Sequence, residues 1–184
     1  MDGFGTFGTE EGCLNLPWGI DVDEFGDIYV ADWGNNRVQV FTSEGHLKHS
    51  FGELGSGEGQ FERPTGVSVD THGDVYVADW GNNRVMQFNP EGQYLWSFTG
   101  DATLSKVARN YMLTNAVPNR LRETGRLEHE RYLRRPRSVR IDSEFRLFIP
   151  DYESYRIQVY QKDFLELDET QYAAPLRNPT LEVT

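Results

Sequence analysis

Two segments of this chain are almost the same, and this internal repeat constrains the fold more than any other feature. The segment Pro17–Val38 recurs 47 residues later as Pro64–Val85, and both contain Tyr-Val-Ala-Asp-Trp-Gly-Asn-Asn-Arg-Val. A third, less regular copy begins at Pro136, 72 residues after the start of the second. Self-similarity over some tens of residues is typical of folds built from stacked supersecondary units.

Each copy predicts four short β-strands. Apolar residues alternate with other residues at period two, as at Ile20 and Val22. Turn-forming sequences separate these runs, and in the first copy they are Asp23–Gly26, Trp33–Asn36 and Glu44–Gly45. We therefore expect each copy to be a four-stranded antiparallel meander. Such a sheet buries both faces only when it stacks between neighbours, as the blade of a propeller does.

The residues within each module follow a recognisable order. The first two, at residues 17–41 and 64–88, open with Pro-x-Gly-[Ile/Val], continue with Gly-x-[Ile/Val]-Tyr-Val-Ala-Asp and close with Asn-x-Arg-[Ile/Val]-x-x-Phe, whereas the third copy is degenerate. The lead-in from Phe51-Gly52 to Pro64 belongs to the same order. These modules resemble NHL repeats, and the resemblance implies an all-β fold of NHL-type β-propeller blades.

Three modules are too few to close a propeller ring within one chain. Known propellers have about 4 to 8 blades. The resemblance to NHL repeats implies a ring of about six, of which three four-stranded antiparallel blades make half. Either two chains pair as a homodimer that closes the ring, or the chain is the C-terminal half of a longer protein. We expect a single partial propeller with blade 1 at about 17–52, blade 2 at about 64–98, blade 3 at about 136–168 and a tail at 169–184.

An insertion separates the second and third copies. Apolar residues at Leu104, Val107, Ala108, Tyr111 and Met112 have the spacing of an amphipathic helix, and residues 120–134 predict a second helical stretch. We therefore expect a helical insertion at about 101–132. Residues 101–137 are basic, with nine Lys or Arg against four acidic residues, although the whole chain has a net charge of −11.

Composition excludes several classes of protein. The acidic body argues against nucleic-acid binding, because phosphate contacts need Lys and Arg. The one cysteine, Cys13, cannot form an internal disulfide or a cysteine-based zinc site. No apolar run approaches the roughly 20 residues of a membrane span. Because no signal peptide is visible, we expect a cytoplasmic protein if Met1 is the true start.

An Asp and an Arg recur five positions apart in every module, as Asp32 with Arg37, Asp79 with Arg84 and Asp151 with Arg156. A residue type repeated in each blade serves the blade, whereas catalysis normally needs one asymmetric arrangement. We interpret these residues as structural, with the Asp accepting backbone hydrogen bonds and the Arg tying the turn. We expect no catalytic residue, no metal ligand and no cofactor, so the chain is predicted not to be an enzyme.

One face of the propeller is the candidate binding surface. Strands of a meander alternate in direction, so turns between strands two and three lie on the same face as the connections between blades. Large aromatic residues occupy these turns, and aromatic residues are typical interface anchors. The candidate binding residues are Trp33, Asn35, Trp80, Asn82, Tyr152, Tyr155, Arg126, Arg131, Arg134 and Arg135.

The favoured function is a protein–protein interaction scaffold that binds a partner protein through this face and the basic insertion. The first alternative is an enzyme or small-ligand binder at the propeller axis, similar to the lyase branch of this family. The second is RNA binding through the basic insertion, although nucleic acid is not the expected partner.

Overall fold

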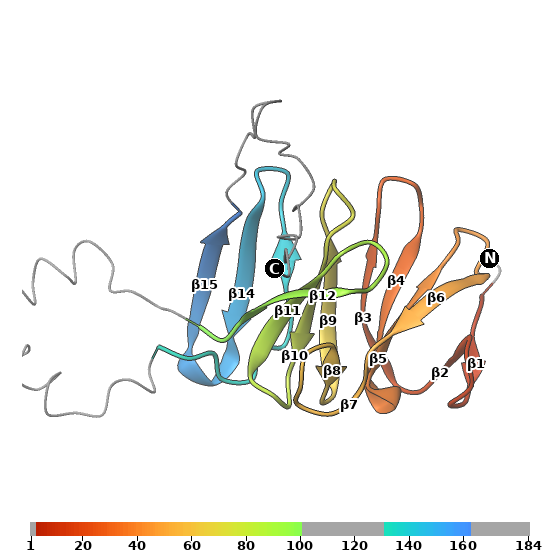
Figure 1. The fold of residues 1–184 in the computed structure, drawn as a ribbon, viewed down its shortest axis with the longest axis horizontal. Coiled ribbons are helices and arrows are strands. Elements are labelled where there is room, and N and C mark those ends of the chain that lie inside the picture. Colours follow the sequence, from red (N-terminus) through yellow and green to blue (C-terminus); the bar gives the residue numbers. More distant parts are fainter. Residues whose placement is uncertain (1–2, 101–130, 163–184) are drawn as a thin grey trace, which may run out of the picture.

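The three repeats form three antiparallel sheets that stand side by side in the computed structural model, which describes residues 3–100 and 131–162 (Figure 1). Strands that are adjacent in sequence pair within each sheet, so each is a meander. Blade 1 contains β3 (Pro17–Val22), β4 (Ile28–Asp32), β5 (Arg37–Phe41) and β6 (Leu47–Phe51). Blade 2 contains β9 (Pro64–Val69), β10 (Val75–Asp79), β11 (Arg84–Phe88) and β12 (Tyr94–Phe98). The prediction of an all-β chain with four-stranded antiparallel sheets is confirmed for these two repeats.

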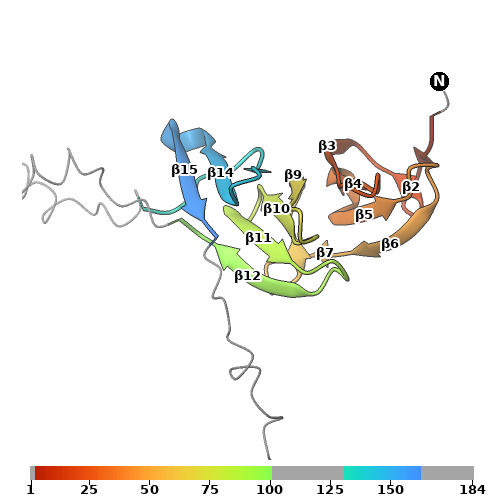
Figure 2. The ribbon, with the colours of Figure 1, turned by 90° about the horizontal axis from the view of Figure 1, so that it is seen from above.

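Blade 3 has three strands among the described residues, namely β13 (Arg140–Ile141), β14 (Arg146–Asp151) and β15 (Arg156–Gln161). Its expected fourth strand falls after Lys162, outside the described residues. The three sheets fan out in an arc when viewed from above (Figure 2).

The helical insertion predicted at 101–132 lies almost entirely outside the described residues. Where its second helical stretch can be compared, at 131–134, the prediction is wrong: the chain forms a turn and a bend and then has no regular secondary structure. The physical reason is that Leu133 corresponds to Phe61 in the lead-in of the preceding blade and is buried in the same way. The Leu133 amide donates a 2.7 Å hydrogen bond to the Thr99 carbonyl, so the chain leaves and re-enters the propeller at adjacent points.

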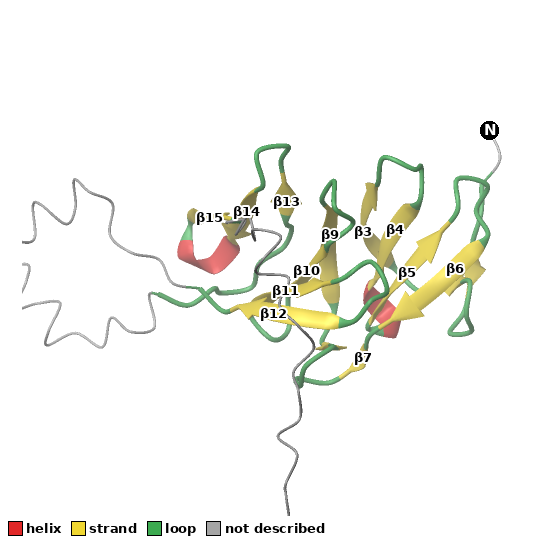
Figure 3. Cartoon of the chain, turned by 45° about the horizontal axis from the view of Figure 1, so that its top comes forward, coloured by secondary structure: helices red, strands yellow, loops and turns green. Residues whose placement is uncertain are grey.

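Short elements complete the lead-in loops and the turns. Before blade 1, β1 (Thr6–Phe7) pairs in parallel with β2 (Cys13–Leu14), and before blade 2, β7 (Glu53–Leu54) pairs in parallel with β8 (Gln60–Phe61). Two 3₁₀ turns, η1 (Trp33–Asn35) and η3 (Tyr152–Ser154), connect the second and third strands of blades 1 and 3 (Figure 3). Both end at a residue in the left-handed conformation, Asn36 and Tyr155.

The hydrophobic core lies between the blades. All five residues of β10 are buried, because blade 2 has a neighbouring blade on each face. One apolar cluster fills the junction of blades 1 and 2, and a second fills the junction of blades 2 and 3. The first includes Val38, Val40, Val67, Val75 and Val77, and the second includes Tyr76, Val85, Val139, Ile141 and Ile149.

The innermost strands touch through glycine. A Cβ added to Gly19 of β3 would lie 2.7 Å from the Cα of Gly66 in β9, and one added to Gly66 would lie 2.8 Å from the Cα of Ser138. Side-chain carbons do not approach backbone this closely, so Gly19 and Gly66 set how tightly the three blades converge.

Replacing Gly66 with Ala tests this packing. The new methyl group meets backbone atoms of blade 3 that cannot turn aside, so we expect the free energy of unfolding to fall by about 1–3 kcal/mol. Urea denaturation followed by circular dichroism measures the change. Gly3→Ala is the matched control, because a Cβ at Gly3 meets nothing within 4 Å. Equal unfolding midpoints for the two variants would contradict the proposed close packing.

Candidate functional site

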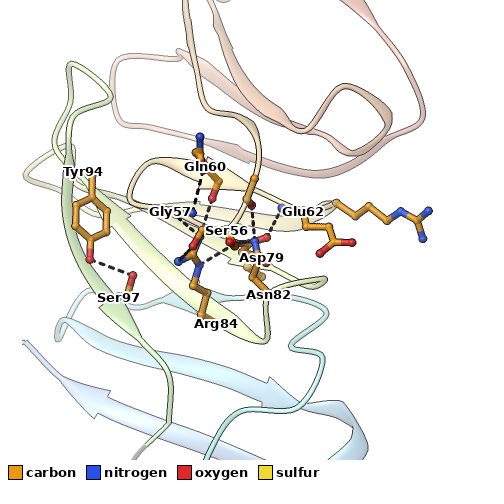
Figure 4. A network of polar contacts seen from close by, with 12 residues as sticks. Ser56, Gly57, Gln60, Glu62, Asp79, Asn82, Arg84, Tyr94 and Ser97 are labelled. Atoms are coloured by element: carbon orange, nitrogen blue, oxygen red, sulfur yellow. Dashed lines mark hydrogen bonds and ion pairs between the residues drawn. The ribbon is translucent and has the colours of Figure 1, made fainter.

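A buried network of charge holds the end of each blade where strands two and three are joined. In blade 2, Oδ1 of Asp79 accepts the Glu62 amide at 2.7 Å, and Oδ2 accepts Asn82 Nδ2 at 2.8 Å and Arg84 Nε at 2.9 Å (Figure 4). The other guanidinium nitrogens of Arg84 donate to three carbonyls of the lead-in loop, those of Ser56, Gly57 and Gln60. The network therefore fixes the turn to the loop that precedes the blade.

The same network recurs in the other blades. Asp32 accepts the Asn15 amide at 2.7 Å and Arg37 Nε at 3.0 Å, and Asp151 accepts the Arg134 amide and Arg156 Nε, both at 2.7 Å. All three aspartates are fully buried. Their oxygens already accept hydrogen bonds from the protein, so the recurrence of this arrangement is explained by the architecture of the blade.

Burial is the largest influence on the Asp79 carboxyl and raises its pKa, while hydrogen bonds from Asn82, the Glu62 amide and Arg84 act in the opposite direction. The ionised carboxylate is therefore tolerated in the interior because its donors are in place. Removing the guanidinium would leave a buried charge with less compensation.

Arg84→Met tests this dependence. We expect the free energy of unfolding at neutral pH to fall by about 3–5 kcal/mol, as for other buried pairs that lose one partner. The variant should raise the pKa of Asp79 in the folded state further above its unfolded value. The folded state then holds the proton more tightly, so the stability of the variant relative to the native chain should fall as pH rises from the folded-state pKa of Asp79 in the native chain to its higher folded-state pKa in the variant.

Urea denaturation at a series of pH values measures both effects. Arg146→Met is the control, because Arg146 forms an exposed pair with Asp142 and should leave the midpoint unchanged within error. A loss of stability in Arg84→Met that is the same at every pH would contradict the role given to the Asp79 charge.

A second recurring contact joins each blade to the one before it. Arg63 and Arg135 begin blades 2 and 3 with positive φ angles of 59° and 52°. The Arg63 amide donates to Asn36 Oδ1 at 2.9 Å, and its guanidinium carbon lies 5.0 Å from the centre of the Trp33 ring. The Arg135 amide donates to the equivalent Asn83 Oδ1 at 2.8 Å, and its guanidinium lies 4.8 Å from the Trp80 ring. We call this Arg–Asn–Trp contact the clasp.

Blade 3 has no following blade among the described residues, and its aromatic residue has a different partner. The guanidinium carbon of Arg137, from the same blade, lies 3.7 Å from the Tyr152 ring centre. Cation–π contacts thus line the whole turn face, which we define as Trp18, Trp33, Arg63, Trp80, Arg135, Arg137 and Tyr152. This face carries η1 and η3 and forms the lower edge of the molecule in Figure 1.

A small aromatic pocket lies at the centre of the turn face. It has a volume of about 110 Å³ and is lined by Trp18, Trp33, Thr65, Trp80 and Arg137. The rings of Trp18 and Trp33 are 6.1 Å apart and tilted by 39°, and Trp18 is 61% exposed. Indole walls with a guanidinium at the margin suit an apolar or planar group that carries negative charge nearby.

The predicted binding residues have different surroundings. Asn35 and Asn82 each use both N–H groups inside the protein, on the buried Asp and on the carbonyl of Gly8 or Gly55. Arg134 and Arg135 both pair with Glu153, at 3.5 and 3.3 Å. Tyr155 is 96% exposed, Arg131 is exposed and Arg126 lies outside the described residues.

Sequence reasoning missed three residues of the turn face: Trp18, Arg63 and Arg137. Trp18 and Arg137 directly follow the proline that opens blades 1 and 3, at the position where blade 2 has Thr65. A tryptophan at a freely variable position beside a fixed glycine was the available signal. Nothing in the sequence alone shows that this position points to the neighbouring turns.

The acidic turn at Asp23 is a hairpin turn held by its own backbone. Oδ1 of Asp23 accepts the amides of Phe25 and Asp27, both at 2.9 Å, and Asp70 makes the equivalent bonds in blade 2. In the part of the chain that the structure describes, no group of three or more His, Cys, Asp or Glu is placed to hold a metal ion. No helix in that same part is long and apolar enough to cross a bilayer.

The repeats that carry these networks can be compared with known families. The family model for the NHL repeat matches residues 14–41 and 61–88, which include the Asp–Arg pairs of blades 1 and 2. These two segments are NHL repeats. The resemblance seen in the sequence is therefore confirmed, and the sheets have a β-propeller-like arrangement.

Curated relatives match a short part of the chain. Protein wech of Drosophila melanogaster is 51% identical over 45 residues, which are 24% of this chain and 5% of wech. The E3 ubiquitin-protein ligase TRIM71 of Rattus norvegicus is 52% identical over 46 residues, or 25% of this chain and 5% of TRIM71. The matched segment thus spans about 5% of the length of these relatives.

Solved structures show the fold alone. A structural genomics protein of unknown function from Bacteroides thetaiotaomicron superposes with a TM-score of 0.54 at 16% identity, covering 80% of this chain and 36% of that protein. The superposition extends well beyond the two NHL repeats, so the arrangement of the sheets as a whole has a counterpart in a known fold.

Proposed function

We propose that this chain is a protein-interaction scaffold whose turn face binds an acidic segment of a partner protein. The observation that carries this proposal is the pocket of Trp18, Trp33 and Trp80 beside arginines that are fixed on aromatic rings. An apolar side chain of the partner would enter the pocket, and carboxylates next to it would pair with Arg63, Arg135 or Arg137.

The geometry supports binding because the face is organised in advance. The turns are tied by the buried Asp–Arg network, and the arginines are held by cation–π contacts instead of moving freely. Less conformational entropy is then lost on association, which favours affinity. Tryptophan and arginine are also the side chains most enriched among residues that dominate binding energy at protein interfaces.

Charge favours a protein partner over nucleic acid. The chain has a net charge of −11, so an extended polyanion would be repelled away from the few arginines of the turn face. One relative is named as an E3 ubiquitin-protein ligase, and a role in contacting another protein is consistent with that name.

The basic segment at 101–132 is proposed to extend this surface. Its ends meet at Thr99 and Leu133, beside a groove of about 730 Å³ that is lined in part by Asn83, Glu153 and one residue of the turn face, Arg135. The segment is thus attached next to the proposed partner site. We assign no reaction and no cofactor to the scaffold, because the recurring Asp and Arg residues have structural partners.

Selection of random peptides on the immobilised chain tests the proposal, with counter-selection on a Trp18→Ala, Trp80→Ala double variant. We expect enriched peptides to contain an aromatic or aliphatic residue flanked by Asp or Glu. In fluorescence anisotropy, their affinity should fall roughly 30-fold or more for the double variant, as when a residue that dominates an interface is lost.

Trp96→Ala is the matched control, because Trp96 on β12 is 63% exposed, like Trp18, but lies outside the turn face. Peptides that bind the double variant as tightly as the native chain would contradict a site at the pocket. Tight binding of a single-stranded RNA oligonucleotide that is lost in the double variant, with no enriched acidic peptide, would replace the protein partner with RNA.

A further inference from the structure

Among residues 3–100 and 131–162, no blade covers the two outermost blade faces, and both faces are apolar. Equivalent positions in the three repeats show this directly, because the same residue is buried where a neighbouring blade is present and exposed where it is absent. We call the face of blade 1 that points away from blade 2 the leading face, and the face of blade 3 that points away from blade 2 the trailing face.

The leading face is built like the surface that blades 2 and 3 use internally. Val67 of blade 2 is 4% exposed and Val139 of blade 3 is 5% exposed, since each packs on the preceding blade. Their equivalent in blade 1, Ile20, is 63% exposed, and Val22 on the same strand is 53% exposed. Side chains of interior type therefore face outward on β3.

The trailing face shows the complementary pattern. Val38 of blade 1 and Val85 of blade 2 are fully buried against the following blade. Their equivalent in blade 3, Ile157, is 65% exposed, and Val159 is 55% exposed. The two internal junctions join a trailing-type face to a leading-type face, so the two free faces have the chemistry needed to pack against each other.

The clasp changes at both free faces together. At the internal junctions an arginine of the following blade meets an asparagine of the preceding blade, as Arg63 meets Asn36. At the free faces the arginine is replaced by Leu16, which is 63% exposed with a φ of 52°, and the asparagine by Tyr155, with a φ of 51°. A polar pair is thus replaced on both sides by an apolar pair in the same backbone conformation.

Charge near the axis is paired inside the chain. Asp21 of blade 1 accepts the Ser68 hydroxyl at 2.9 Å, and Ser68 accepts the Ile141 amide at 3.2 Å, so this position links successive blades. The equivalent residue of blade 3, Arg140, donates to Asp21 of the same chain at 2.7 Å. The two free faces are therefore matched by their apolar residues and not by charge.

We infer that the trailing face of one chain binds the leading face of a second copy, and that two such junctions close a ring of two chains. Leu16 of each chain would meet Tyr155 of the other, and Ile20 and Val22 would pack on Ile157 and Val159. Each chain uses both faces once, so the assembly has a twofold axis and is closed. This inference does not depend on the turn face as a partner site.

Sedimentation equilibrium of the whole chain tests the inference. We expect a mass of twice 21.2 kDa, and roughly 100-fold weaker self-association when Ile157 and Val159 are both changed to Asp, because the junction would bury carboxylates without partners. The Ile20→Asp, Val22→Asp variant should behave in the same way. Circular dichroism confirms that both variants fold, since the altered residues are exposed in the single chain.

Mixing the two variants separates this pairing from other modes of association. Each variant keeps one native face, so the mixture should form a one-to-one heterodimer through a single junction, whereas each variant alone stays monomeric. A native chain that is monomeric at high concentration, an open series of larger oligomers, or variants that do not rescue each other would each overturn the inference.

Discussion

A four-stranded sheet has two faces, and in this chain only another blade can cover them. Val38 and Val40 of blade 1 meet Val67, Val75 and Val77 of blade 2, and the next junction repeats the arrangement. The central strands are continuous apolar runs for this reason. Stability therefore accumulates at the junctions and not inside any single blade, as in other repeat architectures.

The polar networks depend on this packing. A buried Asp such as Asp79 is tolerable because the blade brings an arginine, an asparagine and a backbone amide to it at once. In return, the network fixes the turn on which Trp80 stands. The buried charges and the aromatic residues of the turn face thus belong to one structural unit. The turn face is rigid because buried groups such as Asp79, which a partner cannot contact, hold its turns.

Much of the fold could be predicted from the sequence, because the same pattern of strands and turns occurs in both of the first two repeats. The strands of blades 1 and 2 follow from period and turn residues, and the structural interpretation of Asp79 and Arg84 follows from their recurrence, although their pairing with each other was not predicted. The pocket could not be predicted, since Trp18 stands at a variable position and its neighbours come from two turns and from the first residues of two other modules. The sequence pattern also could not show that both N–H groups of Asn82 bind acceptors inside the protein. One of these acceptors, the Gly55 carbonyl, lies in the lead-in loop, whose path the pattern does not show.

The hydrogen bond between the Leu133 amide and the Thr99 carbonyl has a consequence for how the chain can vary. Because Thr99 and Leu133 are adjacent, the length of the segment between them does not change the distance that the chain must span from blade 2 to blade 3. Loop-closure entropy rises only by about 0.6 kcal/mol for each doubling of length. Segments of very different length could therefore replace one another between Thr99 and Leu133, by evolution or by design, while the packing of blade 2 on blade 3 is kept.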